Sequence, residues 1–320
     1  NNFPAGKGPE VLILHDEQHY VLDRLTDFKG VIFVTGKAGT GKTTLLKLFE
    51  KISTRRSIVL APTGIAAVNV GGQTIHSFFR LPPGFVKRDD YRALSKSLVK
   101  KIEMIVIDEI SMVRADVLDH IDQILRLSTG IDQAFGGIPM LWIGDLYQLP
   151  PVVSTSFEKE YFETQYASPY FFSARVMSEI KEFEVIELGQ VFRQQDQRFI
   201  RILNRIRTNN IDEDDLQELN SRKLEITHSE ETPIITLTST NVIAQNINNL
   251  ALQTLPDSPR IYEARINGIV NQSQHPNDQQ LILKKGAQVM TIRNSPDKKY
   301  VNGSLGHVIE LADDEITVLF

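Results

Sequence analysis

The residues best suited to chemistry in this 320-residue sequence form one glycine-rich segment, GKAGTGKT, at positions 36–43. It fits the pattern G-x-x-x-x-G-K-[ST], in which glycines let backbone N–H groups approach phosphate oxygens. In such a segment Lys42 would reach the terminal phosphates, and the Thr43 hydroxyl would bind Mg²⁺. The segment follows an apolar run and precedes a helical pattern, which is the context that phosphate binding requires. The sequence therefore predicts a nucleoside triphosphate site.

Two acidic residues, Asp108 and Glu109, directly follow the apolar run at 104–107. Ligands of open α/β sheets bind at the carboxyl ends of the strands, so we expect this pair to face the phosphate-binding loop. Asp108 would hold Mg²⁺ through its water shell, and Glu109 would orient or deprotonate the attacking water. Gln148, after the run at 140–143, would sense the γ-phosphate or position water. Such residues are common in turns, so these assignments depend on the glycine-rich segment.

The elements that must position these residues alternate between strand-like and helical patterns. Strands are predicted at 31–35, 57–61, 104–109, 140–145, 183–188 and 233–238. Helices are predicted at 44–52, 115–127, 197–208, 212–220 and 240–252. This alternation indicates an α/β fold with a mostly parallel sheet covered by helices on both faces. After about residue 256, short alternating segments predict consecutive antiparallel strands of a small β-barrel or sheet.

Composition narrows the classes of protein that remain. The chain has 35 basic and 40 acidic side chains, a net charge of −5, and 41% apolar residues, too many for a disordered chain. Because cysteine is absent, a disulfide scaffold, a thiolate zinc site and a cysteine nucleophile are excluded. No apolar run approaches the roughly 18 residues that span a bilayer. The negative net charge argues mildly against a nucleic-acid-binding protein. This net charge, however, is the sum over an arginine-rich stretch at 193–207 and an acidic stretch at 212–231.

Several segments together resemble the superfamily-one DNA helicases. They are GKAGTGKTT from 36, APTGIAAVNVGGQTIHSFF from 61, VIDEISMV from 106, GDLYQLPPV from 144 and LGQVFRQQD from 188. The stretch AFGGIPMLWIGDLYQLPPV from 134 is similar specifically to the Pif (petite integration frequency) helicases, as are GAQVMTIRN from 286 and YVNGSLGHV from 300. The resemblance covers essentially the whole chain. It implies two RecA-like domains with ATP between them, single-stranded DNA across their top, 5′→3′ movement and often action on G-quadruplexes.

The resemblance also assigns residues to ATP, and its implied cofactors are ATP and Mg²⁺. Gln18 matches the upstream glutamine that reads the adenine edge, and Gln148 matches the γ-phosphate sensor. Arg193 matches an arginine that reaches the γ-phosphate from the second domain. The matched phosphate loop comprises Gly39, Thr40, Gly41, Lys42, Thr43 and Thr44. Thr43 and Asp108 are the implied metal ligands, and Glu109 is the acid that acts on water.

A second set of residues matches the DNA-strand contacts of the family. It comprises Pro62, Thr63, Gly64, Thr74, His76, Ser77 and Phe78, with Thr240 and Asn241 from the second domain. Hydroxyls and glycine amides suit phosphates without sequence preference, and aromatic rings stack on bases. Taken alone, Phe78 would more often be a core residue. The implied partners are single-stranded DNA, single-strand/duplex junctions and G-quadruplex DNA.

The same resemblance predicts the domain organisation. Residues 1–188 would form the first RecA-like ATPase domain, with a wedge insertion at about 80–96 whose basic side chains are Arg80, Lys87 and Arg88. Residues 189–256 would begin the second RecA-like domain, and 257–320 would form an incomplete inserted β-barrel. The family's last two motifs, T-x-x-K-S-Q-G and a segment containing A-L-S-R, are absent. We therefore expect the chain to stop before its natural end, which puts hydrolysis by this chain in question.

Two alternatives to a helicase of this family stay open at the level of sequence. One is a nucleotide- and DNA-binding fragment without full hydrolysis, and the other is a superfamily-one helicase of the RecD type. We expect a monomer that does not associate with membranes. The expected location is a bacterial cytoplasm, or the nucleus or mitochondrion if the source is eukaryotic.

Overall fold

The computed structural model of the chain describes residues 15–82, 91–153, 155–191, 196–223, 235–266, 278–292, 295, 297, 299–300 and 303–320. The chain divides into two compact units, Asn1–Ser221 and Arg222–Phe320, each described by itself. This division coincides with neither predicted domain boundary, after 188 or after 256, and those boundaries stay predictions. Among the described helices, none has the length and apolar character needed to cross a membrane.

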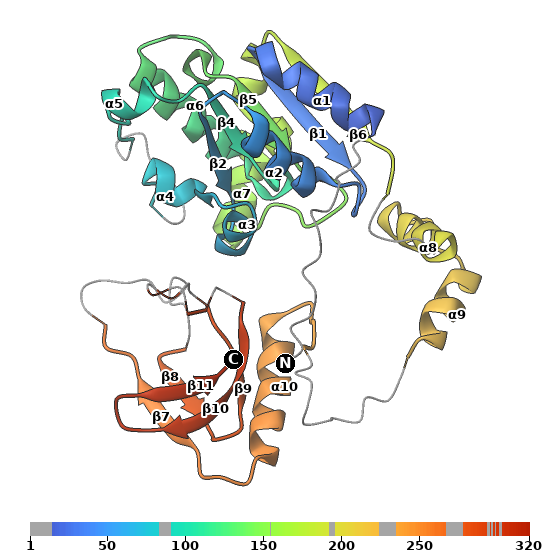
Figure 1. The fold of residues 1–320 in the computed structure, drawn as a ribbon, viewed down its shortest axis with the longest axis vertical. Coiled ribbons are helices and arrows are strands. Elements are labelled where there is room, and N and C mark those ends of the chain that lie inside the picture. The colour runs from blue at the N-terminus through green and yellow to red at the C-terminus, as the bar shows by residue number, and fades with distance from the viewer. Residues whose placement is uncertain are drawn as a thin grey trace, which may run out of the picture. The chain divides into compact units, whose positions relative to one another are not determined.

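The first unit is built on a parallel six-stranded sheet whose strand order is β3-β2-β4-β5-β1-β6 (Figure 1). The strands are β1 (Val31–Gly36), β2 (Ser57–Ala61), β3 (Gln73–Thr74), β4 (Met104–Ile107), β5 (Met140–Ile143) and β6 (Phe183–Leu188). All five strands predicted before residue 190 are therefore confirmed, and the parallel pairing between neighbours confirms the α/β class. The two-residue strand β3 was not predicted, because it is too short to give an alternating pattern.

Helices cover both faces of this sheet (Figure 1). The helices described in the first unit are α1 (Asp16–Asp27), α2 (Lys42–Ile52), α3 (Gly64–Asn69), α4 (Ile75–Phe79), α5 (Lys96–Val99), α6 (Ala115–Thr129), α7 (Ser156–Gln165), α8 (Gln197–Arg207) and α9 (Glu213–Ser221). Successive side chains of a strand point to opposite faces, so Phe33 enters the core that contains α4 and α6, while Val34 enters the core that contains α1 and α2. Strands buried on both sides explain the continuous apolar runs in the sequence.

Part of the predicted wedge insertion is anchored to the first unit. The Tyr91 hydroxyl lies 2.6 Å from Nδ1 of His120 in α6, and the Leu94 N–H donates to the Ser128 hydroxyl at 2.9 Å. Arg80 is exposed and has a left-handed backbone, with φ of 54°. Residues 83–90, which include Lys87 and Arg88, lie outside the described residues. The wedge role stays a prediction.

In the described residues of the second unit, one long helix is combined with two small antiparallel sheets (Figure 1). Its elements are α10 (Asn241–Thr254), β7 (Arg260–Glu263), β8 (Gln280–Leu283), β9 (Gln288–Met290), β10 (Leu305–Leu311) and β11 (Ile316–Leu319). Strands β7 and β8 pair with each other, and β10 pairs with both β9 and β11. Leu252 of α10 and Leu255 pack against the small core around Leu283 and Val308. The predicted antiparallel strands after residue 256 are thereby confirmed.

The prediction of a strand at 233–238 is wrong for the residues that the structure describes. Residues 233 and 234 lie outside the described residues, and 235–238 form no strand. The backbone groups of a strand need a neighbouring strand, and none of the described strands pairs with this segment. Leu237 is accordingly 92% exposed. A parallel sheet of a second RecA-like domain is likewise not found in the described part of the second unit, so that domain stays a prediction.

The core that contains α4 and α6 has an aromatic cluster at its centre, which gives a test of the fold. Trp142 is fully buried, and its ring packs edge-on against Phe135 at 5.8 Å and Phe171 at 5.5 Å between centroids. We expect Trp142→Ala to lower the free energy of unfolding by about 3–5 kcal/mol, because it leaves a large cavity. Urea denaturation measures this change. Leu127→Ala, at a residue that is 58% exposed, is the control and should shift stability by less than about 0.5 kcal/mol.

Candidate nucleotide site and nucleic-acid interface

The glycine-rich loop leaves the end of β1 and enters α2 as the sequence predicts. Gly39 and Gly41 have left-handed φ angles of 84° and 83°, and Gly41 is the N-cap residue directly before α2. A Cβ atom on Gly36 would lie 2.6 Å from the carbonyl oxygen of Leu188 in β6, so only glycine fits there. The loop therefore presents the free N–H groups of the first turn of α2, a geometry that favours an anion.

Lys42 folds back onto the loop that carries it. Its Nζ donates to the carbonyl oxygens of Gly36 at 2.7 Å and Lys37 at 3.1 Å. Burial lowers the pKa of Lys42, and the charges of Asp145 and Glu109 oppose that shift. The other predicted loop residues have different surroundings. Thr40 is buried and donates to the Lys37 carbonyl at 2.9 Å, whereas the Thr43 and Thr44 side chains are exposed in the first turn of α2.

The two acids at the end of β4 lie close enough to this lysine to interact with it. Burial, followed by the charge of Glu109, raises the pKa of Asp108 to about 6. Burial also raises the pKa of Glu109, against the attraction of Lys42. Glu109 itself has a left-handed backbone, with φ of 53°, a conformation that is strained for a residue with a side chain and is often found at functional sites.

These residues fit a hard divalent cation. The buried carboxylate of Asp108 supplies a charged oxygen ligand, and the exposed hydroxyl of Thr43 supplies another oxygen. In the part of the chain that the structure describes, no cluster of three or more His, Cys, Asp or Glu side chains could hold a metal by itself. A cation here would therefore take its remaining ligands from water and nucleotide phosphates, as Mg²⁺ usually does.

Asp108 also gives a stability prediction with a definite sign. Its folded pKa is raised, so ionisation of Asp108 weakens the fold above pH 6 and has no such effect below the unfolded pKa of 3.8. We expect Asp108→Asn to raise the free energy of unfolding by about 1–2 kcal/mol at pH 7.5. The gain should shrink as the pH falls toward 4. Urea denaturation of both proteins at several pH values measures it, and a gain that grows with falling pH would contradict the raised pKa.

Sequence reasoning missed two residues of this site, Asp145 and Arg207. Asp145 follows β5 as Asp108 follows β4, and its side chain is buried. Arg207, in the last turn of α8, donates from Nη2 to Oδ1 of Asp145 at 2.8 Å and stacks on the ring of Tyr147 at 4.2 Å from its centroid. Burial would raise the pKa of Asp145, but the hydrogen bonds from Arg207 and Tyr147 N–H outweigh it and lower the pKa.

A buried acid at a strand end was the signal available for Asp145, since the same reasoning selects Asp108. No signal pointed to Arg207, because it is one of five arginines in the stretch 193–207 and only tertiary contact distinguishes it. Gln148, the predicted γ-phosphate sensor, lies beside this pair, and its Nε2 donates to Oδ2 of Asp145 at 3.3 Å. Arg193 lies outside the described residues, so its role stays a prediction.

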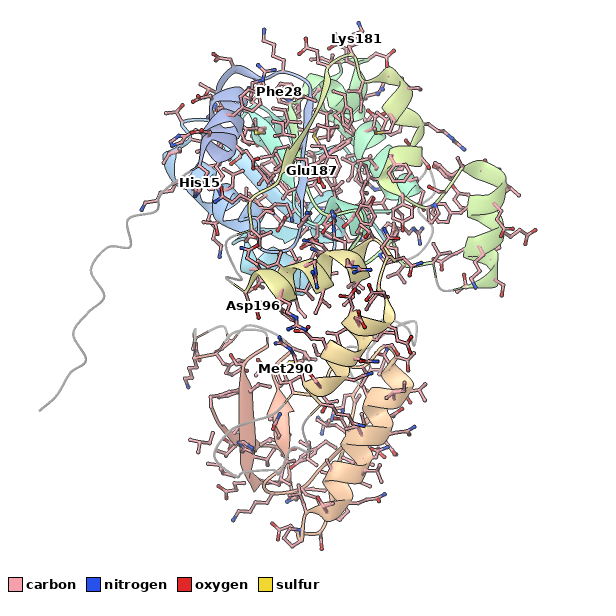
Figure 2. The ribbon with its side chains drawn as sticks, turned by 90° about the vertical axis from the view of Figure 1, so that its right-hand side faces the viewer. His15, Phe28, Lys181, Glu187, Asp196 and Met290 are labelled. Carbon is pink, nitrogen blue, oxygen red and sulfur yellow. The ribbon has the colours of Figure 1, made fainter. Side chains whose placement is uncertain are left out.

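Gln18 lies in the first turn of α1 and is 6% exposed. Its Oε1 accepts from the backbone N–H of His15, which Figure 2 labels at the start of this helix. The neighbouring Glu17 accepts from the N–H of Gly189 at 2.9 Å, directly after β6. Because β6 pairs with β1 up to the phosphate-binding loop, the start of α1 lies at the same edge of the sheet as that loop. Recognition of adenine by Gln18 stays a prediction.

The structure brings together the predicted DNA contacts of the first unit. Thr63 is the N-cap of α3, and its hydroxyl accepts from the Ala66 N–H at 3.2 Å. Thr74 is the N-cap of α4, and its hydroxyl accepts from the Ser77 N–H at 3.2 Å. Parallel pairing of Ala61 with Thr74 places both segments at the carboxyl end of β2, the strand next to β4. Pro62, Gly64 and Ser77 lie in the same two segments. Both hydroxyls still have a hydrogen to donate to a phosphate.

The two aromatic candidates have different surroundings. His76 is half-buried, and burial, reinforced by the charge of Arg114, lowers its pKa, so the imidazole is neutral at pH 7.5. Phe78 is 9% exposed and packs edge-on against Phe79 at 4.8 Å, within the core. The structure thus places Phe78 in the core role that the sequence left open, with little surface for a base. Thr240 and Asn241 begin α10 in the second unit, and their DNA contacts stay predictions.

A phosphate-binding loop after β1, with buried acids at the ends of β4 and β5 of a parallel sheet, defines a P-loop nucleotide-binding protein. A family model of PIF1-like helicases matches residues 13–217. An ATP-dependent DNA helicase Pif1 from Bdellovibrio bacteriovorus is 30% identical over 319 residues, which cover 95% of this chain and 69% of that protein. The chain therefore belongs to the PIF1-like helicase family.

Solved structures agree with this assignment. The crystal structure of Bacteroides Pif1 bound to single-stranded DNA is 38% identical, with a TM-score of 0.82, and the match covers 96% of this chain and 72% of that one. The ATP-dependent DNA helicase PIF1 of Saccharomyces cerevisiae is 35% identical over 95% of this chain, which spans only 36% of that protein. The likeness to the Bacteroides structure confirms the predicted RecA-like fold, and the family match supports the Pif assignment that the sequence resemblance indicates.

Proposed function

We propose that this chain is the motor part of an ATP-dependent DNA helicase that translocates on single-stranded DNA. One observation carries the proposal. The nucleotide site and the candidate DNA segments leave the carboxyl ends of neighbouring strands, β4 and β2, of one sheet. A change at Asp108 or Glu109 on binding or loss of the γ-phosphate is then one strand away from Pro62 and Thr63. Such proximity allows the two sites to bias one conformational equilibrium.

ATP and Mg²⁺ are the proposed cofactors. Lys42 and the first turn of α2 would bind the phosphates, and Thr43 and Asp108 would hold the cation, which neutralises charge on the phosphates when bound. Glu109 would accept a proton from the attacking water, and Gln148 would position that water or the γ-phosphate. A structure of Bacteroides Pif1 in complex with ADP-AlF3 and single-stranded DNA, 37% identical to this chain, supports an ATP site of this kind.

Single-stranded DNA is the proposed substrate, and single-strand/duplex junctions are a second proposed substrate. Capping hydroxyls and exposed backbone suit phosphates, so we expect binding without sequence preference. A structure of two coordinating Pif1 helicases on forked double-stranded DNA, 38% identical to this chain, supports a junction as substrate. Movement from 5′ to 3′, action on G-quadruplexes and a monomeric state are further parts of the proposal. Relatives occur in bacteria and in eukaryotes, and we propose the bacterial cytoplasm, or the nucleus or mitochondrion for a eukaryotic source.

The test is ATP hydrolysis by this chain with and without a thymidine oligonucleotide. We expect single-stranded DNA to stimulate the rate at least about tenfold, because a coupled motor hydrolyses ATP productively only on its track. A blunt duplex of the same length is the control and should stimulate far less. If ATP and DNA bind without any hydrolysis, the binding-fragment alternative is correct for this chain. If DNA does not bind at all, the helicase proposal is wrong.

A further inference from the structure

The side chain of Asp145 joins three groups around the nucleotide site. Its Oδ1 accepts from Nη2 of Arg207 at 2.8 Å and from the N–H of Tyr147 at 3.1 Å. Its Oδ2 accepts from Nε2 of Gln148 at 3.3 Å. With 1% of Asp145 exposed, water contributes little to solvating this carboxylate. The position of the carboxylate is therefore set by the protein groups around it, and Arg207 is the charged donor among them.

The hydrogen bond from Gln148 to Asp145 fixes the orientation of the Gln148 side-chain amide. A carboxylate only accepts hydrogen bonds, so the amide must turn its NH₂ group toward Asp145 and its Oε1 away. The Gln148 backbone N–H also donates to the Asp145 carbonyl at 3.0 Å, which holds the two residues in one tight turn. Since Gln148 is otherwise exposed, Asp145 is its described anchor. A glutamine held this way offers its carbonyl oxygen in one direction, which is what positioning a water or a phosphate requires.

Arg207 in turn fixes Asp145. The Arg207 Nε atom lies 3.3 and 3.2 Å from the two carboxylate oxygens, in addition to the Nη2 contact. The guanidinium also stacks on Tyr147, whose ring lies in the same turn. Without Arg207 the buried Asp145 carboxylate would lose its charged hydrogen-bond donor, and its position would no longer be fixed.

We propose that Arg207, acting through Asp145, is a positioning residue that orients Gln148 toward the γ-phosphate end of ATP. Arg207 thereby makes α8 a part of the nucleotide site. The inference rests on the proposed ATP hydrolysis, and it adds two residues that act on the same step without touching the reacting atoms. It predicts that loss of Arg207 harms the hydrolytic state and leaves binding of the diphosphate product nearly unchanged.

The experiment compares Arg207→Gln with the wild-type chain and with Arg198→Gln. Arg198 is the matched control, because it lies on the same helix, its side chain is 70% exposed, and it pairs with Glu218 instead of Asp145. The affinities of ADP alone and of ADP with aluminium fluoride, which mimics the γ-phosphate in hydrolysis, are measured by calorimetry. For Arg207→Gln we expect the affinity for ADP with aluminium fluoride to fall about tenfold, and that for ADP to change less than about twofold. Arg198→Gln should match the wild type.

A double-mutant cycle with Gln148→Ala separates positioning from general support of the fold. If Arg207 acts through Gln148, then Arg207→Gln combined with Gln148→Ala should be no worse than Gln148→Ala alone. Arg207→Lys should restore only part of the affinity for ADP with aluminium fluoride, because an ammonium lacks the planar fork that spans both carboxylate oxygens. Additive losses, or an equal loss of ADP affinity, would overturn the proposal.

The wild-type measurement distinguishes this proposal from the proposed function. A wild-type chain that does not bind ADP with aluminium fluoride more tightly than ADP alone refutes ATP hydrolysis at this site, and the positioning role falls with it. A wild-type chain that does discriminate, while Arg207→Gln discriminates equally well, refutes only the positioning role.

Discussion

Lys42→Ala should reduce ATP hydrolysis at least about a hundredfold, because it removes the cation that we propose to bind the terminal phosphates. The Lys42 ammonium group donates to two carbonyl oxygens of its own loop, which hold it close to the first turn of α2. Exchange of those neutral acceptors for charged phosphate oxygens would offset the burial that lowers the pKa of Lys42. DNA-stimulated ATPase assays measure the loss, and ATP affinity should fall with the rate.

The control for this substitution is Lys47→Ala, which removes an exposed ammonium group little more than one turn further along α2. We expect it to hydrolyse ATP at the wild-type rate and to unfold at the same urea concentration. If Lys42→Ala kept more than a tenth of the wild-type rate, the phosphate-binding role of the loop would be wrong.

Glu109→Gln should slow hydrolysis by about 10² to 10⁴ while ATP still binds, so that the ATP-bound form accumulates. Burial raises the pKa of Glu109 toward neutrality, which makes it a better proton acceptor from water than an exposed glutamate. The amide keeps the shape and polarity of the side chain, so phosphate and cation binding should be retained. Single-turnover hydrolysis and nucleotide affinity are measured separately on the same preparation.

Glu160→Gln, at an exposed position of α7, is the matched acid-to-amide control and should leave both quantities unchanged. The two outcomes for Glu109→Gln are distinct. Slow hydrolysis with unchanged affinity supports a role in the chemical step, whereas a parallel loss of affinity would reassign Glu109 to binding.

The local sequence pattern was sufficient to predict the features that depend on residues close together in the chain. The glycines of the phosphate-binding loop are needed by the backbone at those positions, since Gly39 and Gly41 are left-handed and Gly36 is packed against Leu188. Strands β1, β4 and β5 are nearly continuous apolar runs because both of their faces are buried, so their positions could be predicted. For the same reason the apolar run at 104–107 was sufficient to assign Asp108 and Glu109 to the end of a strand.

Other features depended on contacts between distant residues. The segment at 235–238 has a strand-like composition, but pairing with a second strand decides whether such a segment forms one, and pairing is not encoded locally. From the sequence, Phe78 could be either a base-stacking ring or a core residue. Only its packing against Phe79 placed it in the core. The compact unit that ends at Ser221 includes α8 and α9, which the sequence assigned to the next domain.

The sequence alone determined the class of this protein and most of its nucleotide site. The phosphate-binding loop is one continuous segment, and Asp108 directly follows its strand, so each feature could be recognised from residues that are neighbours in the chain. Tertiary structure decided that Arg207, among the four described arginines between 196 and 207, joins that site. Arg207 is 62 residues from Asp145, and the ion pair forms because folding brings the last turn of α8 to the turn that follows β5. A buried carboxylate needs a charged donor, and only folding shows which one reaches it.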